Sequence, residues 1–343
     1  MGPTRQVWKT DKAGSLRRLT LRQEDLAATP HDCLRVRTRA CGLNFADLFA
    51  LLGVYSATPE GPFTPGLEFS GRVESVGEAV EDWEPGDRLY GVTRFGGYAD
   101  VIDVKPGYCR PLPSGWTFAQ GAAFPAQTLT AWYALDTLGR ARAGHNVLVQ
   151  SAAGGVGLQC LNICRGLGIR PLASVGSAEK VGFLREKGFD EVIVRRKDRF
   201  KEDVRRLLGE EPLHLALDAV GGWVQKQSYD LLAPTGRLVV FGAARFMPGG
   251  SRMNWIKAAW KYLNRFRADP LNMIAENKSV MAFNLIWLWD HLDLMSCLMR
   301  QIEDLGLPPP HVGREFPFEE APQALAHLQS GQSVGKVVLK VSP

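Results

Sequence analysis

The chain has 343 residues, of which 45% are hydrophobic and 22% charged, a composition typical of a soluble globular protein with room for two domains. The formal net charge of +5 is too modest to favour nucleic acid as a partner, but it leaves an anionic cofactor or a membrane surface open. Six scattered cysteines argue against a secreted disulfide scaffold, and residues 1–18 do not read as a signal peptide. We therefore expect a cytoplasmic protein.

Residues 1–124 contain short runs of β-type sequence separated by glycine and proline. Such runs lie at 33–41, 70–77, 87–92 and 98–104. Short runs with turn residues between them predict a small antiparallel barrel.

From residue 125 the pattern changes to strands that alternate with helices. Strands are predicted at 145–150, 170–176, 191–194, 215–220 and 236–242, and helices at 156–168, 178–188, 202–209 and 222–232. This alternation predicts an α/β fold with a doubly wound parallel sheet over 125–289. Residues 290–343 return to mixed structure, with helices at 292–306 and 319–331 and a strand at 335–341, and we assign them with 1–124 to the second domain.

An insert at 245–270 follows the predicted strand at 236–242. Its apolar residues recur at helical spacing, and its basic residues fall mostly elsewhere; the apolar set is Trp255, Ile256, Ala259, Trp260, Leu263 and Phe266. A basic amphipathic helix with tryptophan can lie in a bilayer interface. We expect instead that the apolar face packs on the cleft of the protein as a lid, with peripheral contact to an anionic membrane as the open alternative.

Residues 146–168 place a glycine-rich turn between a strand and a helix. Gly154 and Gly155 let the backbone approach a pyrophosphate, and Gly157 lets the helix pack against the sheet. The N–H groups and dipole at the start of that helix favour an anion. Ala152 replaces the first glycine of the full fingerprint, so the pattern is A-x-G-x-x-G. It predicts a Rossmann-type dinucleotide site whose contacts include Ala153, Gly154, Gly155 and Val156.

The second strand of such a fold ends near the adenosine ribose. An acidic residue there would bind the 2′-hydroxyl of NAD, but this chain has Ser177 at the tip, with Lys180 and Arg195 nearby. A small polar tip with cations around it suits a 2′-phosphate. The predicted cofactor is therefore NADPH.

Five segments together resemble the medium-chain dehydrogenase/reductase superfamily, and more narrowly its zinc-independent quinone oxidoreductases. They are ACGLNFADL (40–48), TPGLEFSGRVESVG (64–77), PGDRLYG (85–91), LTAWYAL (129–135) and SAAGGVGLQ (151–159). Residues 40–55 and the region 254–288 resemble the vesicle amine transport protein branch of that family. The resemblance implies that the barrel formed by 1–124 and 290–343 is a GroES-like catalytic domain.

The resemblance also implies that a metal site is replaced. The catalytic cysteine and histidine of zinc-dependent relatives would fall at Asn44 and Leu67, and leucine cannot bind a metal. The lobe that holds a structural zinc is absent, because residues 88–110 contain only Cys109. Cys160 and Cys164 lie one helical turn apart and are expected to be packing residues. No metal is predicted.

By the same resemblance, Asn44 contacts the nicotinamide ribose, Thr130 lies against the nicotinamide, and Tyr55 lines the substrate cleft. Backbone contacts to the nicotinamide are implied for segments that include Phe241, Gly242, Ala243, Phe283, Leu285 and Lys336. Tyr55 and Asn44 are the predicted catalytic residues, as hydrogen-bond donors to the oxygen on which charge develops. Tyr55 could equally be a packed loop aromatic.

Without a metal, the acceptor must itself be electrophilic, so we predict an NADPH-dependent reductase of a quinone or an α,β-unsaturated carbonyl compound. The alternative is a nucleotide-binding protein that works at a membrane surface or handles lipid with little catalysis. A homodimer is expected through an edge strand at 279–288, because an exposed apolar edge favours pairing with a second copy.

Overall fold

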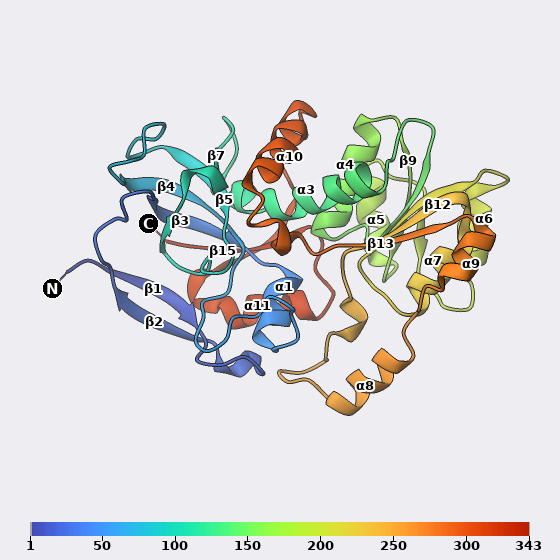
Figure 1. Cartoon of the computed structure of the whole chain (residues 1–343), viewed down its shortest axis with the longest axis horizontal. Coiled ribbons are helices and arrows are strands. Elements are labelled where there is room, and N and C mark those ends of the chain that lie inside the picture. The colour runs from blue at the N-terminus through green and yellow to red at the C-terminus, as the bar shows by residue number, and fades with distance from the viewer. Residues whose placement is uncertain (1, 343) are drawn as a thin grey trace.

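Six parallel strands form one large sheet of the computed structural model, which describes residues 2–342 (Figure 1). The strand order is β10-β9-β8-β11-β12-β13, and every pairing is parallel. The strands are β8 (Asn146–Gln150), β9 (Arg170–Val175), β10 (Val192–Val194), β11 (Leu213–Asp218), β12 (Leu232–Val240) and β13 (Ser279–Ala282). All the strands predicted between 145 and 242 are present.

Both faces of this sheet are buried under helices. Val147 and Val149 of β8 join an apolar cluster with helix α4, whereas Leu148 between them joins a second cluster with helices α6 and α7. Successive side chains of a strand point to opposite faces, so the sheet is covered on both sides and doubly wound, as predicted. The helices are α3 (Pro125–Trp132), α4 (Gly155–Gly166), α5 (Glu179–Glu186), α6 (Phe200–Leu208), α7 (Trp223–Leu231) and α9 (Pro270–Glu276), and a π-helical segment η3 (Tyr133–Leu138) extends α3.

A second sheet of seven strands is antiparallel except for one parallel pair. Its order is β14-β15-β3-β4-β5-β7, and β6 also pairs with β3. The strands are β3 (Leu34–Gly42), β4 (Glu68–Val76), β5 (Arg88–Val92), β6 (Val101–Val104), β7 (Cys109–Pro111), β14 (Val312–Pro317) and β15 (Lys336–Lys340). A separate hairpin joins β1 (Thr4–Lys9) to β2 (Thr20–Asp25). The expected combination of a parallel Rossmann-type sheet with a largely antiparallel GroES-like sheet is confirmed.

Short helices and turns complete the second half of the molecule and its junction with the first. They are η1 (Leu16–Arg18), α1 (Phe45–Leu51), η2 (Pro106–Tyr108), α2 (Phe118–Ala122), η6 (Phe318–Glu320) and α11 (Ala321–Gln329). The helix α10 (Leu292–Asp304) places Met295 and Leu298 in the same apolar cluster as α3 and α4. The domain boundaries at 124/125 and 289/290 stay a prediction.

The edge strand is shorter than predicted. Within residues 2–342, strand β13 pairs only with β12, and it ends at Ala282. Residues 285–288 form a 3₁₀ turn, η5 (Leu285–Leu288), so the strand predicted to continue to 288 is wrong in its second half. The chain leaves the sheet here because it packs on the other half of the molecule. The Trp289 ring stacks on Tyr108 with 3.9 Å between centroids.

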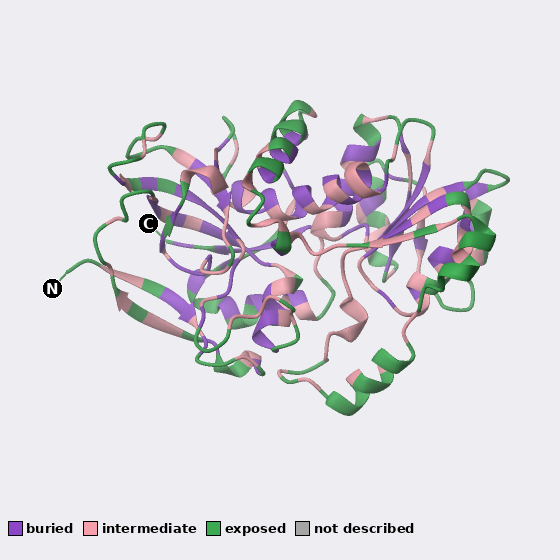
Figure 2. Cartoon of the chain, viewed as in Figure 1, coloured by how far each residue is buried: buried purple, intermediate pink, exposed green. Residues whose placement is uncertain are grey.

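The insert forms the predicted helix, α8 (Trp255–Leu263), after a 3₁₀ turn, η4 (Ala244–Phe246). The Asn254 side chain accepts a hydrogen bond from the Lys257 N–H and starts this helix. Helix α8 projects from the body of the molecule, and most of it is exposed (Figures 1 and 2). No helix within residues 2–342 is both long enough and apolar enough to cross a membrane.

Candidate functional site

A cavity of about 1280 Å³ lies where the carboxyl ends of the parallel strands face α1 and α3. Gln150, Val175, Val240 and Ala282, which end four of those strands, all line it. Ligands of open parallel sheets bind outside the carboxyl ends of the strands. Every predicted site residue except Ser177 lines this cavity, so the fold brings together segments as distant as Asn44 and Lys336.

The phosphate loop has the shape that a pyrophosphate requires. Ser151 leaves β8 with φ of 55°, and α4 begins at Gly155 with Gly154 as its N-cap. A Cβ on Gly157 would meet the Ser151 carbonyl oxygen and would lie 2.6 Å from the Ala152 Cα, so only glycine fits there. The loop therefore leaves a cradle beside the N-terminus of α4 that suits an anion.

Two cationic side chains, Lys180 and Arg195, line the cavity outside the phosphate loop. The Lys180 Nζ donates to the carbonyl oxygens of Gly331 (2.6 Å) and Ser333 (2.9 Å), and Arg195 donates to the Ser174 carbonyl oxygen (3.2 Å). Burial lowers the pKa of both side chains. Ser177 lies outside the cavity lining, next to Glu179, and its hydroxyl lowers the pKa of that exposed carboxyl. A neutral carbonyl shell around Lys180 leaves its charge available to an anion.

The floor of the cavity contains a buried charge pair. Lys336 Nζ lies 2.5 Å from Glu68 Oε1, and the side chains are 6% and 0% exposed. Asn44 joins them: its Nδ2 donates to Glu68 Oε1 (2.9 Å), and its Oδ1 accepts from Lys336 Nζ (2.7 Å). Glu68 Oε2 accepts from the Ala126 N–H at the start of α3 (2.9 Å). Both ends of the Asn44 amide are therefore engaged with protein groups.

A second buried carboxylate lies behind this floor. Asp47 accepts from the Asn44 N–H and the Tyr98 hydroxyl, both at 2.8 Å, and from the Gly66 N–H at 3.2 Å. Burial raises the pKa of Asp47 to about 6, although these donors and Lys336 act in the opposite direction. Asp47 thus fixes the turn that starts α1 and carries Asn44.

Tyr55 closes the cleft against the segment between β13 and η5. Its hydroxyl donates to Asn284 Oδ1 (2.8 Å), and the Asn284 Nδ2 lies 3.4 Å from Ser56 Oγ. Burial raises the pKa of Tyr55 to about 12. Tyr55 is therefore a neutral hydroxyl at physiological pH, and its proton is used in a bond between the two halves of the molecule.

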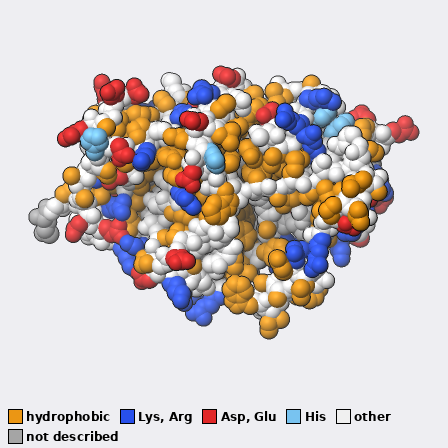
Figure 3. All heavy atoms as spheres, viewed as in Figure 1, with side chains coloured by type: hydrophobic (Ala, Val, Ile, Leu, Met, Phe, Trp, Pro, Cys, Tyr) orange, Lys and Arg blue, Asp and Glu red, His pale blue; other side chains and the backbone are white. Residues whose placement is uncertain are grey.

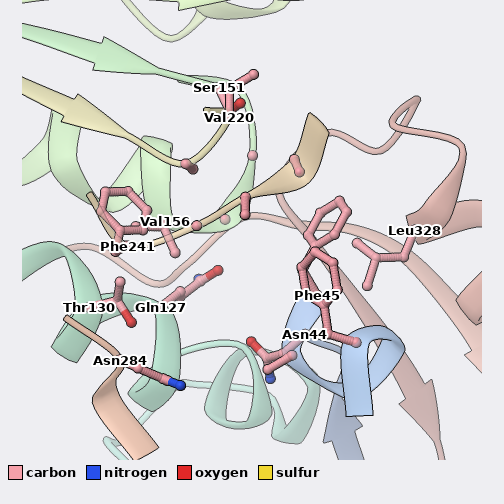
Figure 4. Close-up of a pocket in the computed structure, with 18 of the residues that line it drawn as sticks. Asn44, Phe45, Gln127, Thr130, Ser151, Val156, Val220, Phe241, Asn284 and Leu328 are labelled. Carbon is pink, nitrogen blue, oxygen red and sulfur yellow. The ribbon is translucent and has the colours of Figure 1, made fainter. Parts of the chain in front are cut away.

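The remaining walls are mostly apolar, and two residues of the lining, Gln127 and Gln150, have side-chain oxygens that are buried without a hydrogen-bond partner within residues 2–342. Figure 4 shows Asn44, Gln127, Thr130 and Asn284 on the side of the cavity opposite Val220. Thr130 donates to the Ala126 carbonyl oxygen (2.7 Å), whereas Gln127 Oε1 is buried without a partner in the described residues. The other predicted contact residues, Phe241, Gly242, Ala243, Phe283 and Leu285, form part of the same lining.

The residues at the expected metal position do not fit a metal. Leu67 lines the cavity, and Asn44 is engaged with Glu68 and Lys336. Within the described chain, no three His, Cys, Asp or Glu side chains are grouped as metal ligands would be. Cys160 and Cys164 are buried in the apolar cluster around α4.

Helix α8 lies at the cavity, but only part of its apolar face lines the cleft as predicted. Trp255, Ala258, Ala259 and Tyr262 line the cavity, yet Trp255 remains 66% exposed. Ile256 and Trp260 do not line it and are 85% and 62% exposed. The apolar stripe is wider than the surface it covers, so part of it faces solvent.

Sequence reasoning missed Glu68, Gln127 and Asn284. Glu68 stands beside Leu67 in a segment quoted for the resemblance, Gln127 lies three residues before Thr130, and Asn284 separates Phe283 from Leu285. A buried acidic or amide residue inside an otherwise apolar segment was the available signal.

Comparisons with known proteins agree with this architecture. Residues 30–132 match the alcohol dehydrogenase GroES-like domain, and residues 187–339 match a zinc-binding dehydrogenase family. The chain is 33% identical to the zebrafish (Danio rerio) synaptic vesicle membrane protein VAT-1 homolog, over 90% of this chain and 64% of that protein, slightly less than two thirds of its length. It is 31% identical to mouse (Mus musculus) quinone oxidoreductase-like protein 2, over 90% of this chain and 85% of that protein.

The solved structure of the quinone oxidoreductase from Thermus thermophilus, determined also with NADPH, superimposes with a TM-score of 0.78. The two sequences are 31% identical, and the match covers 98% of this chain and 99% of that chain.

Proposed function

This chain belongs to the medium-chain dehydrogenase/reductase superfamily, a family of oxidoreductases, and on that premise we propose that it is an NADPH-dependent, zinc-independent reductase of quinones or α,β-unsaturated carbonyl compounds. The observation that carries the proposal is one cavity that joins a phosphate loop to a polar floor without metal ligands. The Thermus relative, solved with NADPH, supports a nicotinamide cofactor.

NADPH is proposed over NADH because Lys180 and Arg195 both line the cavity just after the ends of β9 and β10, and the adenosine ribose is expected near the end of the second strand of such a fold. A charge-assisted hydrogen bond to phosphate is among the stronger polar contacts in proteins. Replacing Lys180 with alanine should weaken NADPH binding about tenfold, the loss of roughly 1.4 kcal/mol, and leave NADH binding nearly unchanged. Fluorescence titration measures both constants, with Lys187→Ala at the end of the same helix as the control. Equal losses for the two cofactors would remove the case for the 2′-phosphate.

The acceptor class follows from the donor set of the floor. Leucine at position 67 and an engaged Asn44 offer no place for a Lewis acid that would polarise a simple ketone. An acceptor that is already electrophilic does not need a Lewis acid to polarise it. The cofactor supplies hydride when bound; the chain orients the two reactants between Thr130, Phe241 and Tyr55 and excludes water with apolar walls.

An acceptor screen tests this function. NADPH oxidation would be followed with quinones, alkenals, cyclic enones and simple ketones as acceptors, and NADP⁺ reduction would be followed with alcohols as hydride donors. We expect turnover of the first three classes and none of simple ketones, and we expect activity to survive chelator. Reduction of NADP⁺ by alcohols that is lost when bound zinc is removed would contradict the proposal.

We also propose a peripheral contact with anionic membrane as a second property, so that the protein is cytoplasmic and in part membrane-associated. Seven large apolar side chains between 255 and 274 are more than half exposed: Trp255, Ile256, Trp260, Tyr262, Leu263, Leu271 and Ile274. Figure 3 shows hydrophobic side chains with Lys and Arg beside them on the lower rim, where Figure 1 places α8. Aromatic and basic side chains on one helix suit an anionic bilayer surface.

Flotation with liposomes tests this contact. The double variant Ile256→Ser with Trp260→Ser should lose binding to phosphatidylserine vesicles and keep reductase activity on small quinones, because neither side chain lines the cavity. Trp287→Ser, at an exposed tryptophan away from α8 (51% exposed), is the matched control. If the wild-type protein does not float with anionic vesicles, the proposed membrane contact is wrong.

A further inference from the structure

Glu68 is a carboxylate that three donors of the protein hold in place. One oxygen accepts from the Asn44 amide and lies against the Lys336 ammonium, and the other accepts from the Ala126 N–H. The side chain is fully buried. A carboxylate held by three donors stays where it is and acts as a fixed counter-charge.

The Lys336 ammonium is not saturated in the same way. A lysine has three N–H donors. Within residues 2–342, its protein partners are Glu68 Oε1 (2.5 Å) and Asn44 Oδ1 (2.7 Å), which leaves one donor. Lys336 lines the cavity although its side chain is only 6% exposed. A buried charged donor without a partner costs free energy, so this point of the cavity favours an oxygen that carries negative charge.

The path of the side chain locates that donor. The backbone before Lys336 lies against the phosphate loop, since the Gly335 N–H donates to the Ala153 carbonyl oxygen (2.8 Å). The side chain then passes Gly155, where an added Cβ would lie 3.7 Å from the Lys336 Cδ, and its Nζ ends at Asn44. Asn44 faces the same space as Thr130 and Asn284 (Figure 4). The cation thus lies on the floor between the loop and the Tyr55–Asn284 bond.

We propose that Lys336 is a catalytic residue, whose ammonium donates a hydrogen bond to the acceptor oxygen on which negative charge develops. The inference rests on the proposed function. As hydride from NADPH forms a bond to the β-carbon, the electron pair of the carbon–carbon double bond moves so that the carbonyl oxygen becomes an enolate oxygen. The α-carbon then takes a proton from water, and Lys336 keeps its own. Glu68 and Asn44 are positioning residues that hold the ammonium in place.

A coloured phenol tests the site without turnover. Para-nitrophenol places an oxygen that ionises where the enolate oxygen would form, and its absorbance reports the phenolate. With NADP⁺ bound to the full chain, the pKa of the bound phenol should fall by about one unit, as expected beside a cation. No fall in the wild-type protein would overturn the proposal, and this result needs no variant that folds.

Variants separate a direct contact from support of the fold. Lys336→Met should abolish the fall in the phenol pKa and lower kcat/KM for enones about 100-fold, with the Kd of NADPH changed less than about threefold. Lys340→Met, an exposed lysine on the same strand, is the control. In Glu68→Gln the fall in the phenol pKa should be kept or become larger, because the Glu68 carboxylate no longer competes with the phenolate for the Lys336 ammonium. A fall in the phenol pKa that survives in Lys336→Met would overturn the proposal.

Two outcomes distinguish this inference from the proposed function. If Lys336→Met weakens NADPH binding at least tenfold and leaves the phenol unaffected, the free donor binds the cofactor and the inference fails, while reductase activity stands. If the wild-type protein perturbs the phenol through Lys336 but oxidises no NADPH with any acceptor, the anion site stands and the proposed reductase activity fails.

Discussion

Single residues decide whether the phosphate loop can form. Gly157 has no room for a side chain because the Ser151 carbonyl and the Ala152 backbone occupy that space. We expect Gly157→Ala to lower the free energy of unfolding by about 1–3 kcal/mol, the usual cost of an overpacked site, and to weaken NADPH binding. Gly166→Ala, in the same helix, meets no atom within 4 Å and should be neutral or stabilising. Chemical denaturation and cofactor titration measure both variants; equal stability of the two would show that the loop relaxes.

Asp47 gives the floor a pH dependence whose sign follows from its burial. A carboxyl whose folded pKa is raised from 3.8 to about 6 binds its proton more tightly in the folded state. Its contribution to stability is therefore present below pH about 4 and is lost as the pH rises through about 6. The ¹³C resonance of the Asp47 carboxyl should titrate near pH 6, whereas Asp11, whose pKa Arg22 lowers, should titrate below 3.8 in the same sample. An Asp47 midpoint below 4 would contradict the burial argument.

At the level of elements, α8 presents two different apolar faces. Trp255 lines the cavity, and Trp260 does not. Trp255→Ala should therefore raise the KM for long-tailed quinones severalfold more than the KM for benzoquinone, because a lid over a bulky acceptor is lost. Trp260→Ala is the matched control and should change neither KM. Equal effects of Trp255→Ala on both quinones would show that α8 is not a lid.

The sequence predicts elements better than it predicts what their side chains meet. The alternation of buried strands and helices between 145 and 242 has a clear periodicity, so those elements were predictable. The end of β13 was not, because residues 283–289 leave the sheet to contact Tyr55 and Tyr108, which lie far away in the sequence. The exposure of α8 was also not predictable, because an amphipathic pattern predicts an apolar face but not which part of the protein covers it.

The contacts on the floor of the site could not be predicted from the sequence either. Asn44 and Lys336 could be proposed from a resemblance, but their bond spans 292 positions of the chain, and Glu68 joins them only when three strands and α3 are in place. No local sequence pattern indicates that these three residues come into contact. The phosphate loop, by contrast, is contained in one short segment and could be recognised from its residues.

On the scale of the whole molecule, the free edge of β13 leads us to propose a homodimer. The strand pairs with β12 on one side only, and Trp287, just beyond it, is 51% exposed. Pairing of two such edges about a two-fold axis would continue the sheet across both copies. Light scattering at micromolar concentration should give twice the mass of the chain. A monomer mass for the wild-type protein would contradict this proposal.

We propose that hydride passes in this cavity from NADPH to an electrophilic carbon without a metal. The direct measurement uses NADPH deuterated at the transferred position of nicotinamide C4, a cyclic enone, and chelator-treated protein of known zinc content, with mass spectrometry of the product. We expect one deuterium on the β-carbon of the saturated ketone and an unchanged rate after chelation. A product without deuterium, or activity that returns only with added zinc, would contradict it.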